Sequence, residues 1–260
     1  MRTARVAPIF GTVASFRFHG SVTAIARVQH AADAALADLT KVDRVLSPFR
    51  PDSDLSRIRT GELALSAGDP MVGEVARLCA DFEQRTGGLF AASWNGGFDP
   101  TGLVKGWAVE RAAARLASLV GPGTGVEAVG VSVGGDMRLF TAADSEWTWP
   151  IGVVDPADPS RVAGLVEVRN GAVATSGIAE RGAHIIDPRS GHPVTAPVSA
   201  TVIAPSLTDA DVWATAAVVA GFDDLSWISV APETTGMLLH ADGRARRWIR
   251  GVEVSVSAAT

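Results

Sequence analysis

The change in periodicity that decides the predicted fold lies in GWAVERAAARLASLVGPGTGVEAVGVSVGGDMRLF, residues 106–140. Apolar residues over 106–120 recur every three or four positions, as they do along the buried face of an amphipathic helix. After a glycine-rich turn, residues 129–140 are typical of β-strands, interrupted by Gly134 and Gly135. Such a pair predicts a bulge, or a place where another group approaches the bare backbone. The stretch therefore predicts a helix followed by strands.

Helical periodicity dominates the chain before this stretch. Residues 1–20 alternate as a β-hairpin does, and they lead into a predicted helix over 30–46 that ends before Pro48. A second helix is predicted over 70–86, with Pro70 in its first turn. The N-terminal part is thus expected to supply most of the helices.

Strand signals dominate after the stretch. Asn170–Gly171 is the dipeptide of a β-hairpin turn. One helix interrupts the strands, and it is predicted to be capped near Thr208 and to end at Gly221. A closing hairpin is expected around residues 242–243, where the sequence is Asp-Gly.

This order of elements indicates the fold class. Helices early and strands late favour an α+β fold over a doubly wound parallel sheet, in which the two would alternate. No stretch with the composition of a linker divides the chain, so residues 1–260 are predicted to form a single domain.

Composition excludes some classes of function. A formal net charge of −5 argues against a surface that binds nucleic acid. The single cysteine, Cys79, has no partner for an intramolecular disulfide and is expected to be a small buried hydrophobe. The N-terminus lacks the apolar region of a secretory signal, and no apolar run reaches the roughly 20 residues of a membrane span. We therefore expect a cytoplasmic protein with no nucleic-acid partner and no stable membrane insertion.

The segment 98–113, FDPTGLVKGWAVERAA, is the first candidate for ligand binding. Asp99 and Lys105 flank a turn that contains Gly102 and leads into a helix. Amide groups at a helix N-terminus favour an anion such as phosphate, and Lys105 adds a positive charge. The alternative is a solvated loop before a helix.

A second candidate is the segment 133–140. Two glycines in a strand allow a planar or phosphorylated ligand to lie against the backbone, and Asp136 would receive ligand hydroxyls. The alternative is a β-bulge in which Asp136 caps a turn.

The segment 184–193, HIIDPRSGHP, is a third candidate. His184 is a candidate base, which Asp187 would orient only if the chain turns between them. We expect Asp187 and Pro188 to fix such a turn. The alternative is a turn that is simply filled by polar side chains. No role is predicted for Arg189 or His192.

The fourth candidate is the predicted helix at 208–217. Asp211 and Thr215 stand at i and i+4, so they share one face. A carboxylate and a hydroxyl suit a hard cation such as Mg²⁺. The alternative is a local hydrogen bond on an otherwise apolar helix.

Together and in this order, these segments resemble the ApbE family, the FAD:protein FMN transferases. The similarity extends from FGT at 10–12 to TGMLL at 235–239. It includes VDRVLSPFRPDSDLSRI, TGGLF, FDPTGLVKGWAVERAA, VSVGGDMRLF, VATSGIAERGAHIIDPRSGHPV and VIAPSLTDADVWATAAVVAG. The resemblance implies a T-fold-related α+β domain with mixed or antiparallel sheets, and a cleft between lobes that holds FAD.

The resemblance also implies the reaction. Such enzymes bind Mg²⁺ beside the FAD pyrophosphate and transfer FMN to a threonine or serine hydroxyl of an acceptor flavoprotein, while AMP leaves. Because that reaction develops charge on phosphate oxygens, positioning and a metal ion supply most of the catalysis. Mn²⁺ suits the same oxygen site.

Matched motif by motif, the resemblance implies roles for individual residues. His184 would be the base, since histidine commonly acts as a general base in enzymes. The metal would be bound by the carbonyl of Gly102 and by the side chains of Asp211 and Thr215. The implied contacts with FAD are Phe10, Asp99, Lys105, Gly134, Gly135, Asp136, Thr175, Ser176 and Gly177. Phe10 stands where the family usually has methionine, and it keeps an apolar surface there.

Two other functions fit the same residues. Water in place of the acceptor hydroxyl would make the chain an FAD pyrophosphatase that gives FMN and AMP. A non-catalytic FAD-binding protein is the third alternative, although it would not need His184, Asp211 and Thr215 together.

Overall fold

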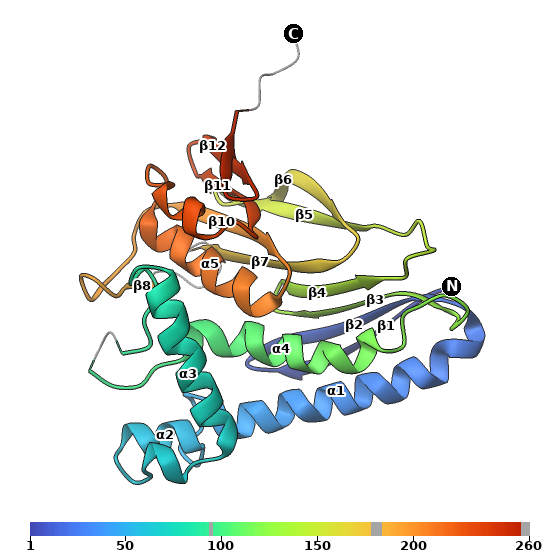
Figure 1. Ribbon diagram of the computed structural model, residues 1–260, viewed down its shortest axis with the longest axis horizontal. Coiled ribbons are helices and arrows are strands. Elements are labelled where there is room, and N and C mark those ends of the chain that lie inside the picture. The colour runs from blue at the N-terminus through green and yellow to red at the C-terminus, as the bar shows by residue number, and fades with distance from the viewer. Residues whose placement is uncertain (94–95, 178–183, 256–260) are drawn as a thin grey trace.

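A computed structural model of the chain describes residues 1–93, 96–177 and 184–255 (Figure 1). The helices are α1 (Ile25–Leu46), α2 (Asp54–Arg59), α3 (Pro70–Arg85), α4 (Thr101–Ala117) and α5 (Leu207–Ala220), with short 3₁₀ turns at Val22–Ala24, Leu65–Ala67 and Ser226–Val230. The strands are β1 (Arg2–Ile9), β2 (Thr12–Gly20), β3 (Val126–Val133), β4 (Asp136–Thr141), β5 (Trp149–Asp155), β6 (Asp158–Val168), β7 (Gly171–Gly177), β8 (Ile186–Asp187), β9 (His192–Pro193), β10 (Val198–Ala204), β11 (Thr235–His240), β12 (Ala245–Ile249) and β13 (Val252–Val254).

The centre of the fold is a nine-stranded sheet in the order β1-β2-β3-β4-β7-β10-β11-β12-β13. Every strand pairing in the described part of the chain is antiparallel. β7 and β10 are neighbours in the middle of this sheet, and every residue of β10 but one is buried. The α+β fold expected from the sequence is confirmed.

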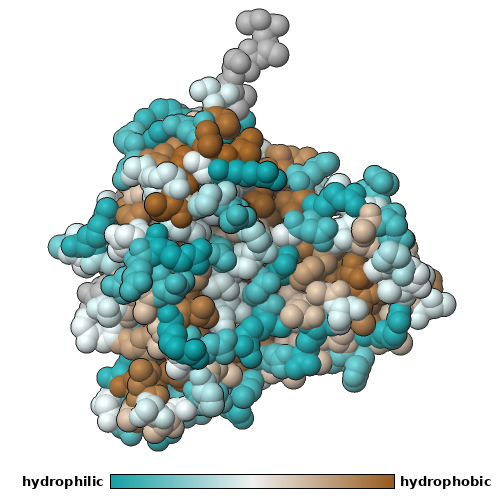
Figure 2. All heavy atoms as spheres, in the orientation of Figure 1, coloured by the Kyte–Doolittle hydropathy of each residue, from teal (hydrophilic) through white to brown (hydrophobic). Residues whose placement is uncertain are grey.

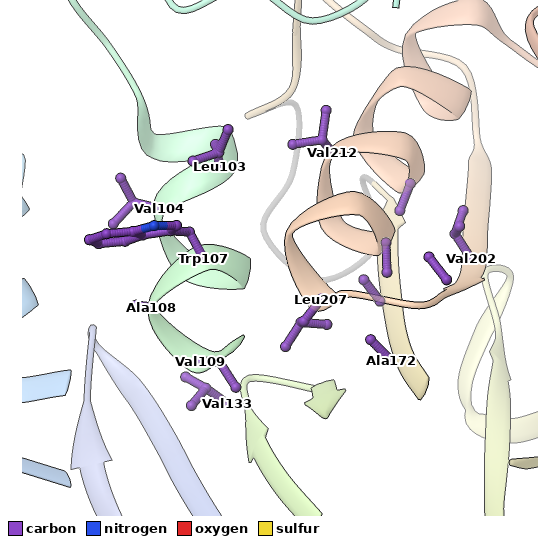
Figure 3. Packing of buried hydrophobic residues seen from close by; sticks show 14 of the residues in the cluster. Leu103, Val104, Trp107, Ala108, Val109, Val133, Ala172, Val202, Leu207 and Val212 are labelled. Carbon is purple, nitrogen blue, oxygen red and sulfur yellow. The ribbon is translucent and has the colours of Figure 1, made fainter. Parts of the chain in front are cut away.

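Three helices pack against the sheet, where α5 lies beside β7 and β10 and α4 and α1 lie beside the earlier strands (Figure 1). Buried side chains of α4 and α5 meet those of β3, β7 and β10 in the main hydrophobic core (Figure 3). All but three residues of α5 are buried, because this helix is covered both by the sheet and by α4. This helix is therefore held by neighbours along most of its surface.

The opposite face of the sheet is partly covered by the β5–β6 hairpin. A smaller hydrophobic cluster joins the two layers and includes Leu139 of β4, Trp149 of β5 and Val168 of β6. On the face of the molecule seen in Figure 2, hydrophilic and hydrophobic residues are interspersed. No helix in the described part of the chain combines the length and apolar character that a membrane span needs.

Two turns differ from the sequence predictions. Gly134 and Gly135 form the turn between β3 and β4 with φ values of 58° and 96°, rather than a bulge, because two successive residues with positive φ suit a two-residue hairpin turn. Asn170–Gly171 is a turn but closes no hairpin, since β6 pairs with β5 whereas β7 joins the large sheet. The side chain of Asn170 instead bonds both backbone groups of Thr141.

Helix boundaries also shift from those predicted. α1 begins at Ile25 and α4 at Thr101, so both are longer at their N-termini than the periodicity indicated. α5 is capped by Ser206, two residues before Thr208, and the Ser206 hydroxyl accepts from the amide of Asp209. The early start of α4 places Gly102 and Lys105 inside the helix rather than in a loop before it.

Candidate active site

A cavity of about 870 Å³ brings together residues that are far apart in the sequence. It lies between the first turns of α4, the face of α5, the end of α1 and the turn that joins β1 to β2. Eight of the residues with a predicted catalytic, FAD-binding or metal-binding role line it, namely Phe10, Asp99, Gly102, Lys105, Ser176, His184, Asp211 and Thr215. The candidate segments 98–113, 184–193 and 208–217 all line this cavity. The glycine pair at 134–135 does not.

Asp211 and Thr215 share the face of α5 that looks into the cavity, as their spacing predicted. Asp211 is only 4% exposed, and its Oδ2 accepts a hydrogen bond of 2.9 Å from the amide of Gly106. The hydroxyl of Thr215 lies 3.2 Å from that of Ser176 on β7. Both metal candidates are therefore held by neighbours from other elements.

Gly106 explains how α4 and α5 come so close. A Cβ atom at this position would lie 2.7 Å from the carbonyl oxygen of Leu207 and 2.8 Å from Cβ of Asp211. Only glycine allows this approach. In a regular α-helix the amide of residue 106 donates to the carbonyl of residue 102. Here the amide of Gly106 also donates across to Asp211 on α5.

Lys105 extends between two carboxylates. Its Nζ lies 2.5 Å from Oδ2 of Asp136 and 3.8 Å from Oδ1 of Asp211. Because the Lys105 side chain is 25% exposed and lines the cavity, its charge also acts on whatever the cavity holds. The sequence predicted a positive charge at this place, but not the ion pair with Asp136 that holds it.

Asp136 is buried behind the cavity wall rather than exposed to a ligand, since it is 1% exposed and does not line the cavity. Its Oδ1 accepts from the amide of Thr175 at 3.2 Å. Burial and, next, the charge of Asp211 raise the pKa of Asp136 to about 7, while Lys105 opposes the rise. The interpretation of Asp136 as a receiver of ligand hydroxyls therefore lacks support from its position.

Four other residues from the same sequence segments also stand outside the cavity lining. Gly134 and Gly135 turn between strands, and Thr175 lies on β7 with its hydroxyl 2.9 Å from that of Thr201. Gly177 packs against β10, where a Cβ would lie 3.2 Å from the carbonyl oxygen of Val198. These residues shape the sheet that supports Ser176.

Asp99 lies at the entrance to α4. Its Oδ1 accepts from the amide and the hydroxyl of Thr101, at 3.2 Å and 2.7 Å, and it forms an ion pair of 2.7 Å with Arg59. The carboxylate therefore orders the first turn of the helix and ties α2 to it. The sequence reasoning did not identify Arg59.

His184 is exposed and lines the cavity, and residues 178–183 before it lie outside the described part of the chain. The turn after it is built by Asp187, whose carboxylate accepts from both the backbone and the guanidinium of Arg189 at 2.9 Å. These hydrogen bonds lower the pKa of Asp187. Arg189 also donates to the carbonyl of Val219 at 3.3 Å, which ties the turn to α5. Asp187 thus fixes the turn, as expected.

The sequence reasoning missed the outer wall of the cavity. Pro48, Phe49 and Arg50 line it from the loop after α1, and Leu89 and Phe90 line it from the loop after α3. Phe49 is 91% exposed, which is unusual for a phenylalanine. The motif SPFRP did not indicate this residue, because its exposure is known only from the structure.

A second cavity, of about 830 Å³, lies on the other face of the sheet beside the β5–β6 hairpin. None of the site residues expected from the sequence lines it. The first cavity is therefore the candidate active site.

The model of the ApbE family matches residues 95–238, which is more than half of the chain. The chain belongs to the ApbE family. The match includes the three segments that supply α4, the His184 turn and α5 to the cavity.

Individual relatives agree with this membership. The FAD:protein FMN transferase of Treponema pallidum is 35% identical over 140 residues, which cover 50% of this chain and 38% of that protein. Those of Vibrio cholerae and Escherichia coli are 34% and 33% identical over 133 and 101 residues, covering 47% and 35% of this chain. The matched stretches span 38% and 29% of these two relatives' own lengths.

Solved structures of ApbE proteins share the fold across nearly the whole chain. The ApbE protein of Thermotoga maritima has a TM-score of 0.77 at 24% identity, covering 95% of this chain and 97% of that one. The flavin transferase ApbE of Vibrio cholerae has a TM-score of 0.74 at 21% identity, covering 95% and 96%.

Proposed function

We propose that this ApbE-family chain transfers FMN from FAD to a threonine or serine hydroxyl of an acceptor flavoprotein and releases AMP. The observation that carries the proposal is the meeting of Lys105, His184, Asp211 and Thr215 in one cavity. The names of the relatives, FAD:protein FMN transferases, support the same reaction.

A magnesium ion fits the donors in this cavity. Asp211 and Thr215 offer a carboxylate and a hydroxyl, and Gly102 offers a carbonyl from the first turn of α4. All three are hard oxygen ligands, which Mg²⁺ and Mn²⁺ prefer. Within the described residues no three His, Cys, Asp or Glu side chains cluster as a metal centre, so the site would rely on substrate phosphates and water as well. When bound, the ion would offset negative charge on the diphosphate.

The chain's own residues would bind and orient the substrate. Lys105 would face the diphosphate with a positive charge, and the apolar surface of Phe10 and Leu46 would contact the flavin ring. The acceptor oxygen would attack the FMN phosphorus, and the bond from that phosphorus to the bridging oxygen would break. AMP would leave with the bridging oxygen, and the new phosphoester would link FMN to the acceptor.

His184 would take the proton of the acceptor hydroxyl. It lines the same cavity as Asp211, and Arg189 ties the turn that follows it to α5. Its exposed position would let a side chain of another protein approach it. Both properties suit transfer to a protein acceptor.

The test is incubation of the chain with FAD, Mg²⁺ and candidate acceptor flavoproteins, followed by intact-mass measurement of the acceptor. We expect an added FMN mass, lost when the target threonine is changed to valine and when EDTA removes the metal. His184→Ala should abolish labelling. His192→Ala is the matched control, because His192 is an exposed histidine on β9, in the hairpin that follows His184, and it does not line the cavity.

Other outcomes would identify another function. AMP release at a rate that no acceptor changes would indicate an FAD pyrophosphatase. Binding of FAD without AMP release would indicate a non-catalytic FAD-binding protein. Either result would contradict the proposed transfer.

The proposal also includes one domain over residues 1–260 and a cytoplasmic location. Limited proteolysis that leaves a stable fragment much shorter than the chain would contradict the first. Recovery outside the cytoplasmic fraction of the native cells would contradict the second.

A further inference from the structure

Three charged side chains from α4, β4 and α5 meet at the wall of the cavity. The ammonium of Lys105 lies 2.5 Å from Asp136 and 3.8 Å from Asp211. Both carboxylates are nearly buried, with exposed fractions of 1% and 4%. One cation thus stands between two anions and is clearly closer to Asp136.

The two carboxylates are held in similar ways. Oδ1 of Asp136 accepts from the amide of Thr175, and Oδ2 of Asp211 accepts from the amide of Gly106. Each carboxylate therefore has one oxygen fixed by a backbone amide and the other turned toward Lys105. The lysine, whose stem has four rotatable bonds, is the mobile member of the three.

We propose that Asp136 is a positioning residue that holds Lys105 away from Asp211, so that the ammonium does not compete with the metal ion for Oδ1 of Asp211. The inference rests on the metal site of the proposed function. It gives Asp136 a role without contact with FAD, which agrees with its position behind the cavity lining.

The physical reason is the balance of charge. With Asp136 ionised, the charge of Lys105 is balanced by a carboxylate that lies away from the cavity lining. In Asp136→Asn that charge is gone, while the carboxylate of Asp211 still lies 3.8 Å from the ammonium. A rotation of the lysine stem would then pair Lys105 with Asp211, and a divalent cation would have to displace it. Changes to the groups that surround metal ligands typically alter metal affinity about 10–100-fold, and we expect a loss of that order here.

The test is Mn²⁺ binding, measured by the electron paramagnetic resonance signal of the unbound ion at pH 8, with and without FAD. We expect Asp136→Asn to bind Mn²⁺ about 10–100-fold more weakly than the wild type. The double variant Asp136→Asn, Lys105→Met should recover most of this loss, because the competing ammonium is gone. Asp144→Asn, which removes an exposed carboxylate after β4, should bind as the wild type does.

Each other outcome has one meaning. Equal affinity in the wild type and Asp136→Asn overturns the positioning role, and so does a double variant as weak as the single one, since a merely structural effect would not be rescued. A wild type that binds no Mn²⁺ even with FAD would contradict the metal site of the proposed function instead.

A measurement on the wild type serves if Asp136→Asn does not fold. A crystal structure with FAD and Mn²⁺ should keep Nζ of Lys105 within ion-pair distance of Asp136. A lysine whose ammonium lies closer to Asp211 than to Asp136 in that structure would overturn the inference.

Discussion

The amide of Gly106 donates a hydrogen bond of 2.9 Å to Oδ2 of Asp211, and this bond joins α4 to α5 at the candidate active site. It requires the two helices to approach so closely that no side chain fits at position 106. A single glycine therefore sets both the packing of the helices and the position of the carboxylate.

Gly106→Ala should destabilise the chain although alanine is the better helix former. Its Cβ would collide with the backbone oxygen of Leu207, and such overpacking typically costs about 1–3 kcal/mol. The matched control is Gly73→Ala in α3, where a Cβ meets nothing within 4 Å and the helix should gain about 1 kcal/mol. Urea unfolding measures both, and equal stabilisation of the two variants would contradict the close approach.

The raised pKa of Asp136 predicts a dependence of stability on pH. Between its ordinary value of 3.8 and about 7, the folded state keeps a proton that the unfolded state has lost. The free energy of unfolding contributed by this group therefore falls as pH rises through that window, by at most about 1.4 kcal/mol per pH unit.

The comparison that isolates this effect is between the wild type and Asp136→Asn. The stability of the wild type relative to the variant should decrease from pH 4 to pH 7 in thermal or urea unfolding. A stability difference that stays constant or grows over this range would show that the pKa of the Asp136 carboxyl is not raised.

Cys79 should be inert toward thiol reagents in the folded chain. It is buried in α3, and burial raises the pKa of its thiol from 9.0 to about 12, so the reactive thiolate is reduced about a thousandfold. A chromogenic disulfide reagent at pH 8 should modify the urea-unfolded chain fully while the native chain stays unmodified. Rapid reaction of the native chain would contradict this burial.

Asn170→Ala should weaken the junction between the two sheets. Its side chain accepts from the amide of Thr141 at 2.8 Å and donates to the carbonyl of the same residue at 3.2 Å. Thr141 is buried, and leaving its backbone groups unsatisfied typically costs about 1–3 kcal/mol. Asn170→Asp keeps the acceptor and loses the donor, so its loss in urea unfolding should be smaller. An unchanged midpoint in Asn170→Ala would contradict the role of this side chain.

The sequence by itself determined the fold class and part of the site. Periodicity depends on local geometry, so the change from helix to strand near residue 125 and the i, i+4 pair Asp211 and Thr215 were predictable. The turn after His184 was predictable too, since Asp187 and Pro188 are local turn signals, whereas the hydrogen bonds of Arg189 to Asp187 and Val219 were not predicted. The resemblance to the ApbE family rested on the same local motifs.

The tertiary structure decided which of these segments meet. Whether the strand after Asn170 returns to β6 or joins the large sheet depends on burial against α5, not on the turn dipeptide. Asp136 looked like a ligand contact because its motif is polar and glycine-rich, yet long-range packing buries it against Lys105. Charges that are distant along the chain interact only after the fold brings them together in a place from which water is excluded. For that reason the sequence identified the charged residues, and the fold alone paired them.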